Sequence, residues 1–382
     1  MSKPAALYIG LMSGTSIDGI DVALVEFKED DCELLQTYNH PIDARIKQKL
    51  VEISSPVSQF EIRSTNRIEL LAELDVIMGH YFADAVNQLI DIHQVEADKV
   101  IAIGNHGQTI RHRPNNQSPF TIQIGDANVI AEKTGIQTVA DFRRSDIAVG
   151  GQGAPLAPAF HNAILRSALE NRIILNLGGI ANITYLPQDI SQPVIGFDTG
   201  TASTLLDAWY LIHRPDAKDE FDRDSQFAQQ GQVHRELLNK LLKDPFFQRS
   251  PPKSTGREYF SLDWLTKQVN KIQAPIAVVD VQRTLLELTV KTIANSIKNI
   301  PINNYNIYAC GGGMHNRFLL EQLSKELKQP VQTSNDIGID GDYLEAMTFA
   351  WLAKQRLDQL PGNLPSVTGA SREKILGCIY LP

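Results

Sequence analysis

The chain contains the same local pattern twice: an apolar strand, a glycine-containing turn and a second apolar strand. The first copy comprises ALYIGLM, the turn from Ser13 to Ser16, and IDVALVEF, after which CELLQTYNH supplies a third strand. The second comprises RIILNL, the turn Gly178-Gly179 and IANITYL, followed by the strand VIGFD. Helical patterns follow the strands in both halves, so the order of elements predicts an α/β chain with two related halves.

The length of 382 residues suits two domains of ordinary size. A Gly/Pro-rich stretch from Gly150 to Pro158 interrupts the periodicity, so we place the domains at 1–150 and 151–382. The predicted helices span 58–94, 126–133, 203–213, 231–243, 261–271, 279–298, MHNRFLLEQLSKEL and YLEAMTFAWLAKQRL. The last helix belongs to the second domain, and packing back onto the first is left open.

Composition and charge exclude several classes of protein. The net charge of −8 argues against nucleic acid as a main partner. No apolar run approaches the roughly 20 residues needed to span a membrane, and the start MSKPAALYIGLM is too short and too polar for a secretory signal. Cys32, Cys310 and Cys378 have no CxxC spacing, so neither a disulfide framework nor a zinc site is supported, and a cytoplasmic location is expected.

The first glycine hairpin is a candidate phosphate site. The chain contains no GxxxxGK[ST], which excludes a P-loop kinase. The segment from Gly10 to Gly19 presents backbone N–H groups and small hydroxyls, a combination that binds anions, and its glycines suit positive φ angles. Asp18 or Asp21 is then available to a Mg²⁺ ion. The alternative is a purely structural β-hairpin with a serine-rich turn.

Recurrence of the glycine turns favours the phosphate site. A second glycine hairpin, Asn176 to Gly179, and a third turn, Gly311-Gly312-Gly313, both follow apolar strands. Two hairpins facing one nucleotide, with a triple glycine that lets adenosine approach, are typical of the way actin-like ATPases and hexokinases hold ATP.

At this level of detail the chain resembles the anhydro-N-acetylmuramic acid kinase family. The segments that carry the resemblance are GLMSGTSIDGID, GNHGQTIRH, VADFRRSDIAVGGQGAPLAPAFH, NLGGIANIT, GFDTG, KSTGRE, CGGGMHN and LEAMTFAWLA. They occur in the order and spacing of that family, from Gly10 to about Gly369. The resemblance implies two actin-like (ribonuclease H-like) domains with an ATP cleft between them, ATP and Mg²⁺ as cofactors, and a homodimer.

The resemblance also implies the reaction. ATP phosphorylates the 6-oxygen of 1,6-anhydro-N-acetylmuramic acid while water opens the anhydro bridge, which gives N-acetylmuramic acid 6-phosphate and ADP. This reaction belongs to the recycling of peptidoglycan, the amino sugars of the cell wall.

Residue by residue, the match assigns a catalytic aspartate, a nucleotide site and a sugar site. Asp198 in GFDTG matches the catalytic aspartate; a cap on the helix STLLDAW is the alternative from the sequence alone. The ATP-binding positions are Gly14, Thr15, Ser16, Ile17, Asp18, Gly19, Ile20, Asp21, Gly178, Gly179, Gly311, Gly312 and Gly313, and Asp18 is the candidate metal ligand.

Thr109, Arg143 and Glu345 match positions of the sugar site. A threonine and an arginine suit the hydroxyls and the lactyl carboxylate of a muramyl sugar, and Arg144 is able to exchange roles with its neighbour. Glu345 has the alternative of an ordinary polar helix face. His106 is interpreted as a hydrogen-bonded structural residue, and Lys253 in KSTGRE as a loop lysine rather than a phosphate ligand.

The chain departs from the family pattern directly after GFDTG. The family usually continues Pro-Gly-Asn there, whereas this chain has Thr201-Ala202-Ser203. Contacts made by the usual asparagine are therefore in doubt, although Ser203 suits a helix cap.

Two other functions compete with the anhydro-sugar kinase. An ordinary hexosamine or pentulose kinase of the same fold would use Asp198 to deprotonate a substrate hydroxyl. An actin-like ATPase that moves a partner protein would need a peptide-binding module, for which the sequence leaves no room. The segments HGQT, VADFRR and GGQGAP favour the anhydro-sugar kinase over the ordinary sugar kinases, which lack them.

Overall fold

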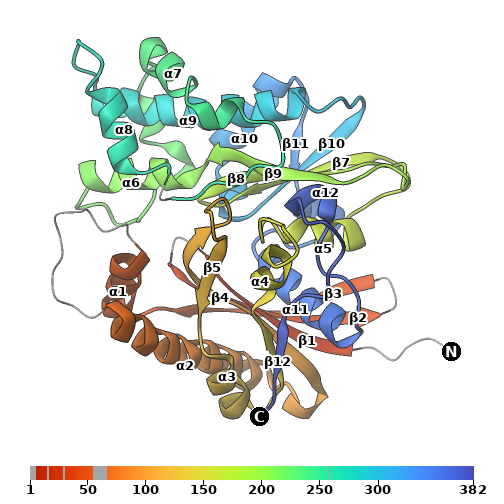
Figure 1. Cartoon of the computed structure of the whole chain (residues 1–382). Coiled ribbons are helices and arrows are strands. Elements are labelled where there is room, and N and C mark those ends of the chain that lie inside the picture. The colour runs from red at the N-terminus through yellow and green to blue at the C-terminus, as the bar shows by residue number, and fades with distance from the viewer. Residues whose placement is uncertain (1–5, 15–16, 29–30, 55–66, 258) are drawn as a thin grey trace. The chain divides into compact units, whose positions relative to one another are not determined.

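The structure is a computed structural model that describes residues 6–14, 17–28, 31–54, 67–257 and 259–382. The chain forms two compact units, Met1–Leu165 with Tyr343–Pro382, and Arg166–Asp342. Each unit combines helices with one β-sheet, so the α/β prediction is confirmed (Figure 1). The Gly/Pro-rich stretch 150–158 lies inside the first unit.

The first unit is built on a mixed sheet. Its elements are β1 (Ala6–Ser13), β2 (Gly19–Lys28), β3 (Asp31–Pro41), α1 (Ala44–Ser54), α2 (Arg67–His93), η1 (Ala97–Lys99), β4 (Val100–Arg113), β5 (Phe120–Ile124), α3 (Ala127–Thr134), β6 (Thr138–Ala140), α4 (Phe142–Ile147), α5 (Ala157–Ile164), α11 (Leu344–Leu357), α12 (Pro365–Thr368) and β12 (Cys378–Tyr380). The strand order is β12-β6-β4-β1-β2-β3, and β5 pairs with β4. Strands β1, β2 and β3 form an antiparallel meander, and β4 runs parallel to β1.

The second unit repeats this arrangement. Its elements are β7 (Asn171–Leu177), β8 (Ile180–Leu186), β9 (Ile195–Thr201), α6 (Ser203–His213), η2 (Arg223–Ser225), η3 (Ala228–Gln230), α7 (Arg235–Leu241), η4 (Pro245–Gln248), α8 (Leu262–Val269), α9 (Val278–Lys298), β10 (Tyr305–Cys310), η5 (Gly312–His315), α10 (Arg317–Leu327), β11 (Val331–Thr333) and η6 (Ser334–Ile337). The order β11-β10-β7-β8-β9 again joins an antiparallel meander to two parallel strands. The two related halves predicted from element order are therefore confirmed.

Most predicted elements lie where the sequence places them. Helix α6 begins and ends at the predicted residues, and α9 differs from its prediction by one residue. The helix predicted over 58–94 corresponds to α2, and its first nine positions, 58–66, lie outside the described residues. The helix predicted over 231–243 is shorter, because α7 begins only at Arg235, where the His234 side chain caps it.

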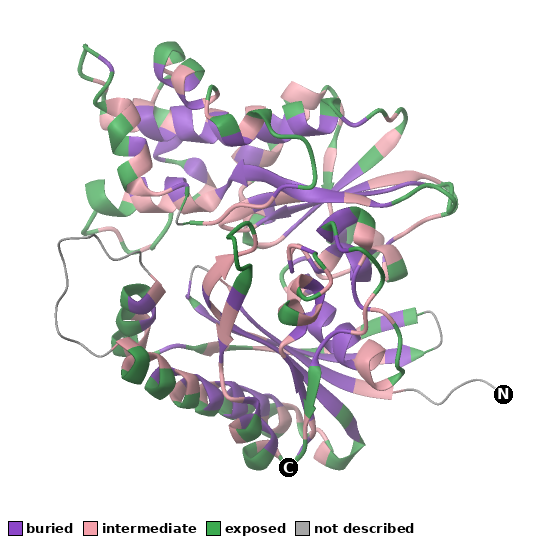
Figure 2. Cartoon of the chain, viewed as in Figure 1, coloured by how far each residue is buried: buried purple, intermediate pink, exposed green. Residues whose placement is uncertain are grey.

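The sheet of the first unit is covered on both faces. Side chains alternate along a strand, so Ile9 and Leu11 of β1 point into a core shared with α2. Figure 2 shows α2 buried along one side and exposed along the other. Gly10 and Gly104 point to the opposite face, where α11 contacts β1 and β4 (Figure 1).

Helix α11 approaches these two strands so closely that a side chain does not fit. A Cβ atom on Gly10 would lie 1.8 Å from the carbonyl oxygen of Ala346, and one on Gly104 would lie 1.9 Å from that of Phe349. Both obstacles are helix backbone, which cannot rotate aside as a side chain does. The packing of α11 on the sheet therefore requires glycine at both positions.

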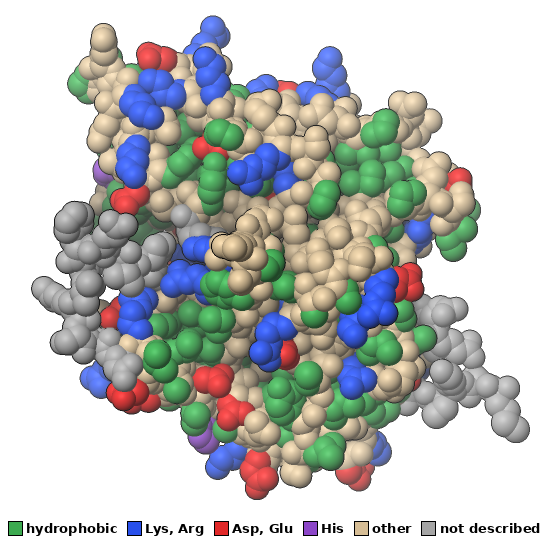
Figure 3. All heavy atoms as spheres, in the orientation of Figure 1, with side chains coloured by type: hydrophobic (Ala, Val, Ile, Leu, Met, Phe, Trp, Pro, Cys, Tyr) green, Lys and Arg blue, Asp and Glu red, His purple; other side chains and the backbone are tan. Residues whose placement is uncertain are grey.

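The surface carries charges of both signs. Basic and acidic side chains are interspersed on the face shown in Figure 3. Within the described residues, every helix is too short or too polar to span a membrane.

We predict that Gly104→Ala destabilises the protein by at least about 3 kcal/mol, at or above the upper end of the usual cost of overpacking, because helix backbone must move. Urea denaturation followed by circular dichroism measures this loss. Gly312→Ala is the matched control, since nothing lies within 4 Å of the added atom, and its midpoint should stay close to that of the unsubstituted protein. Equal midpoints for the two variants would show that α11 is free to shift.

Candidate active site

Strand β4 contains a bulge in the segment GNHGQT. Leu11 of β1 pairs with Asn105, whereas Ser13 pairs with Gln108, so β4 has one residue more than β1 in this interval. Gly107 takes the extra length with a φ of +76°, and its N–H donates to the Asn105 side chain at 3.0 Å. Bulges re-aim the side chains beside them, and here they redirect the polar residues that follow.

Gln108 fastens the first glycine hairpin. Its Nε2 donates to the carbonyl oxygen of Gly14 at 3.2 Å, and its Oε1 lies 2.7 Å from the hydroxyl of Ser13, which donates to it. Both Gln108 and Ser13 are buried. The end of β1, where the nucleotide segment was predicted, is thus held by a residue that sequence reasoning did not single out. The signal was present: a glycine inside a strand pattern indicates a bulge.

Within the predicted nucleotide segment, Thr15 and Ser16 lie outside the described residues. Ile17 is in the left-handed region, with a φ of 58°, and Gly19 is not. The expectation for Gly19 is therefore wrong; its missing side chain instead lets β3 approach, since a Cβ atom would lie 2.8 Å from the Asn39 amide oxygen. Ile17 is 3% exposed because its side chain packs into the core of the unit.

The other described residues of the segment differ in exposure. Asp18 is exposed, Ile20 is fully buried, and the half-buried carboxylate of Asp21 accepts a hydrogen bond from Asn39 Nδ2 at 2.8 Å. Asp18 therefore presents its carboxylate to solvent at the end of the turn.

The half-buried Arg143 is hydrogen-bonded to the buried His106. Arg143 Nε donates to His106 Nε2 at 3.0 Å, and its Nη1 donates to the carbonyl oxygen of Gly153 at 2.7 Å. The His106 ring also packs against Phe349 of α11, with 4.7 Å between ring centroids. Burial first, and the Arg143 charge second, hold the pKa of His106 well below its usual value. His106 is therefore a neutral acceptor that orients the guanidinium.

Asp146 fixes the loop that contacts Arg143. Its fully buried carboxylate accepts hydrogen bonds from Asn363 Nδ2 at 2.7 Å, from Thr368 Oγ1 at 2.8 Å and from Gly153 N at 2.7 Å. The C-terminal segment of the chain is thereby joined to the loop after α4. This explains why the Gly/Pro-rich stretch belongs to the first unit.

The two adjacent arginines differ sharply. Arg143 is half-buried on His106, whereas Arg144 is exposed and its Nε donates to Asp141 at 2.7 Å. Arg144 therefore does not share the surroundings of Arg143.

The remaining sugar-site candidates lie on elements that contact β4 or belong to it. Thr109 is on β4 itself, and its Oγ1 accepts a hydrogen bond from Gln123 Nε2 at 3.1 Å. Glu345 is half-buried in the first turn of α11, next to the residue whose carbonyl meets Gly10. Helix α11 contacts β4, and Arg143 donates a hydrogen bond to His106 of β4. All three candidates therefore belong to β4 or to elements that contact it.

In the second unit, Asp198 is buried on β9. It is 8% exposed, its Oδ2 accepts a hydrogen bond from the Thr255 N–H at 2.8 Å, and its own N–H donates to the Lys253 carbonyl at 3.1 Å. If Asp198 capped helix α6, the helix would begin at Thr199. It begins at Ser203 instead, with Ala202 as its N-cap. The interpretation of Asp198 as a cap on this helix is therefore wrong.

The start of α6 is satisfied by the second glycine hairpin. The N–H groups of Ala202 and Thr204 donate to the Gly179 carbonyl, and that of Ser203 donates to the Gly178 carbonyl, at 3.0 to 3.1 Å. Backbone carbonyls thus occupy the donors that a capping side chain would take. The suggestion that Ser203 replaces a cap is wrong for this reason.

The triple glycine has a packing role at two of its positions. A Cβ atom on Gly311 would lie 2.5 Å from the Asn176 side chain, and one on Gly313 would lie 2.6 Å from that of Leu177. Gly312 has open space around it. Because β7, β9 and β10 run in the same direction, both glycine turns and Asp198 lie toward the carboxyl-terminal edge of the sheet, where α/β proteins usually bind ligands.

Lys253, interpreted from the sequence as a loop lysine, is buried. It is 8% exposed, and its Nζ lies 4.9 Å from the ring centroid of Phe246 and 5.6 Å from that of Phe197. Burial lowers its pKa, an effect that the Asp198 charge opposes.

Comparison with known proteins covers nearly the whole chain. The family model described as anhydro-N-acetylmuramic acid kinase matches residues 6–382. A protein of that name from Coxiella burnetii (strain Dugway 5J108-111) is 50% identical over 379 residues, which cover 99% of this chain and 98% of the relative. One from Vibrio parahaemolyticus is 48% identical over 377 residues, with 98% of each chain covered.

One solved structure has a distant likeness to this chain. An activator of 2-hydroxyisocaproyl-CoA dehydratase from Clostridium difficile aligns with 93% of this chain and 98% of its own, with 11% identity and a TM-score of 0.42. So distant a likeness carries no argument.

We predict that His106 stays neutral from pH 8 to pH 5, as ¹⁵N NMR of the imidazole would show. Because its pKa is lower in the folded than in the unfolded chain, protons bind the unfolded chain more strongly. Stability should therefore fall as the pH drops below about 6.5, by up to about 1.4 kcal/mol per pH unit from this residue. His106→Gln still offers Arg143 an acceptor but does not titrate, so its urea midpoint should fall less steeply. Identical slopes would contradict the neutral state.

Proposed function

The chain belongs to the anhydro-N-acetylmuramic acid kinase family, and on that premise we propose how its residues carry out the reaction. It is a phosphotransferase with a sugar acceptor, and it serves the recycling of the cell wall. The relatives from Coxiella burnetii and Vibrio parahaemolyticus each match over 98% of their own length. The assignments of individual residues below are proposals.

The proposed reaction consumes ATP, water and 1,6-anhydro-N-acetylmuramic acid. In this sugar the 6-oxygen carries no proton, since it is bonded to the anomeric carbon. As that bond breaks, the 6-oxygen takes the γ-phosphoryl group from ATP, and a water oxygen bonds to the anomeric carbon. The products are N-acetylmuramic acid 6-phosphate and ADP, and the proton released by water goes to a base.

We assign the base to Asp198. A general base must be ionised and must accept a proton at a fixed position. Its carboxylate is held by the Thr255 N–H at 2.8 Å, a bond that favours the charged form. That carboxylate does not cap helix α6, whose N-cap is Ala202. This is the observation that most supports the assignment.

The nucleotide is assigned to the glycine turns. Ile17 supports the hairpin 14–21 as a binding segment, because a β-branched residue in the left-handed region costs about 1–3 kcal/mol and such strain is concentrated at functional sites. Gln108 holds this turn in place. In the second unit, Gly312 is the glycine whose open surroundings suit close approach of a ligand.

A magnesium ion fits beside this segment. Mg²⁺ bound with a nucleotide needs only one or two carboxylates, because phosphates and water complete its coordination. Asp18 offers an exposed carboxylate there. Across the described part of the chain, no group of three or more His, Cys, Asp or Glu side chains could hold a metal by itself. When bound, the ion would neutralise charge on the β- and γ-oxygens of ATP.

The sugar is assigned to Thr109, Arg143 and Glu345. Arg143 suits the lactyl carboxylate, because a guanidinium has five N–H donors and binds carboxylates in a fixed geometry. His106 and the Gly153 carbonyl fix its orientation, as preorganised recognition requires. We also propose that the protein works as a homodimer in the cytoplasm, which size-exclusion chromatography with light scattering and fractionation of cells would test.

We predict that Asp198→Asn lowers turnover by about 10²- to 10⁴-fold, the usual contribution of a general base. ATP affinity, measured by calorimetry, should change little, since the amide keeps the shape of the carboxylate. Asp216→Asn is the control, because Asp216 is exposed outside the predicted site, and it should keep full turnover. Near-normal turnover of Asp198→Asn would remove this residue from the mechanism.

The route of water separates this reaction from that of an ordinary hexosamine kinase. In the proposed mechanism a single turnover in ¹⁸O-water places the label on the anomeric carbon and none on the transferred phosphate. The initial product should have inverted configuration, because water attacks opposite the departing oxygen. Mass spectrometry and NMR of the product measure both. An unlabelled anomeric carbon would revive the ordinary kinase, in which Asp198 deprotonates a hydroxyl.

A further inference from the structure

The loop 253–255 surrounds Asp198 from one side. The Lys253 carbonyl accepts from the Asp198 N–H at 3.1 Å, and the Thr255 N–H donates to the Asp198 carboxylate at 2.8 Å. The loop therefore holds both the backbone and the side chain of the same residue. These two hydrogen bonds hold the backbone of Lys253 next to Asp198 on β9.

The Lys253 ammonium lies among aromatic rings. Its Nζ lies 4.9 Å from the Phe246 ring centroid and 5.6 Å from that of Phe197, which directly precedes Asp198. Cations at such distances are attracted by the negative face of a ring, and the attraction is strongest where water is excluded. A flexible lysine in a loop ordinarily extends into water. Here it is 8% exposed, so the fold keeps the charge beside β9.

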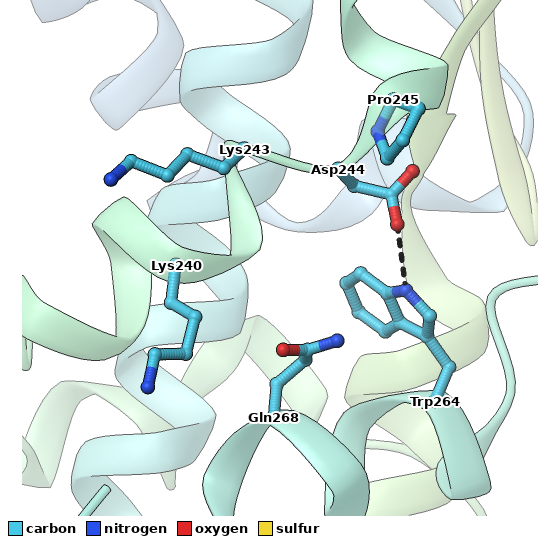
Figure 4. Close-up of a pocket in the computed structure, with 6 residues that line it drawn as sticks. All are labelled: Lys240, Lys243, Asp244, Pro245, Trp264 and Gln268. Carbon is cyan, nitrogen blue, oxygen red and sulfur yellow. Dashed lines mark hydrogen bonds between the residues drawn. The ribbon is translucent and has the colours of Figure 1, made fainter. Parts of the chain in front are cut away.

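Asp244 forms hydrogen bonds with Phe246 and with two other aromatic residues, Tyr259 and Trp264. The Asp244 carboxylate accepts from Phe246 N and from Trp264 Nε1, both at 2.9 Å, and from the Tyr259 hydroxyl at 2.8 Å. Figure 4 shows the bond to Trp264 at the edge of a surface pocket of about 270 Å³. Phe246 lies on η4, two residues after the capping aspartate, which accepts its N–H. The ring that faces Lys253 is part of a rigid cluster.

A buried carboxylate acts as a base only if its surroundings favour the ionised form. Burial by itself favours the protonated form of an aspartate, which accepts no proton from water, whereas an opposite charge nearby favours the ionised form. The Asp198 charge acts on Lys253 and raises its pKa against the effect of burial, and this interaction is mutual. On the proposed function, Asp198 must be ionised when water attacks.

Other charged groups also lie near this pair. Arg249, at the end of η4, lowers the pKa of Lys253, and Asp244 is bonded to Trp264 and Tyr259. Arg257 belongs to the same loop as Lys253. The neighbouring strand β8 presents Asn182 opposite Asp198, and α9 presents Thr292 toward Gly200; neither titrates.

We propose that Lys253 is the positioning residue that keeps the base Asp198 ionised, acting through its charge and not through contact with the substrate. The inference rests on the proposed function of Asp198. It deepens that function by naming a group that keeps a buried carboxylate ionised at neutral pH.

The test is the pH profile of kcat/KM. Lys253→Met keeps the apolar stem but removes the charge, so the pKa of Asp198 should rise, and the acid limb should move up by about 1–3 pH units. Lys253→Arg keeps the charge and should leave that limb in place even where kcat falls. Lys243→Met, at an exposed lysine of the pocket in Figure 4, is the matched control and should have an unchanged profile.

Stability and ligand binding complete the comparison. Urea denaturation should show that Lys253→Met is folded; if it does not fold, Lys253→Gln takes its place. An unmoved acid limb in the neutral variant would overturn the inference, and a raised KM for ATP with that unmoved limb would assign Lys253 to the phosphates. If Asp198→Asn itself retains turnover, Asp198 is not the base. That result is distinct from a failure of the inference about Lys253, in which Asp198→Asn loses turnover but the acid limb of Lys253→Met does not move.

Discussion

The contact of α11 with β1 and β4 is the constraint on which the first unit depends. At Gly10 and Gly104 the helix backbone lies where side chains would otherwise stand. The same two strands lead into the first glycine hairpin and the bulge of GNHGQT, and the same helix carries Glu345 and the ring that packs on His106. Two missing Cβ atoms therefore set the distance between the nucleotide segment and the sugar-site candidates of this unit.

The glycine turns of the two units are held in place by different hydrogen bonds. Each places a glycine turn at the end of the first strand of its meander. In the first unit a side chain, Gln108, fastens that turn through Gly14 and Ser13. In the second, the backbone of α6 fastens it through the carbonyls of Gly178 and Gly179. The shared strand order is thus compatible with turns that are held by different hydrogen bonds.

Local patterns predicted much of the fold and left out what depends on distant contacts. The first and last residues of α6 and α9 could be predicted closely, because the apolar spacing and the turn residues that define them lie within the segment itself. The burial of Lys253 was not, since it requires Phe246 and Asp198 to meet through tertiary packing. The bond between Asp146 and Asn363 joins residues more than two hundred positions apart. Asp198 itself was chosen by resemblance, and the structure supplied the physical distinction from a helix cap.

The discontinuity of the first unit has a consequence for its biosynthesis. Residues 343–382 complete a unit whose other part is translated before Arg166–Asp342. The second unit can therefore fold on the ribosome as a continuous segment, in the way that domains generally fold during synthesis. The first unit must wait for α11 to cover Gly10 and Gly104, and for Asn363 and Thr368 to reach Asp146. The part of the protein that is made first is thus the last to be finished.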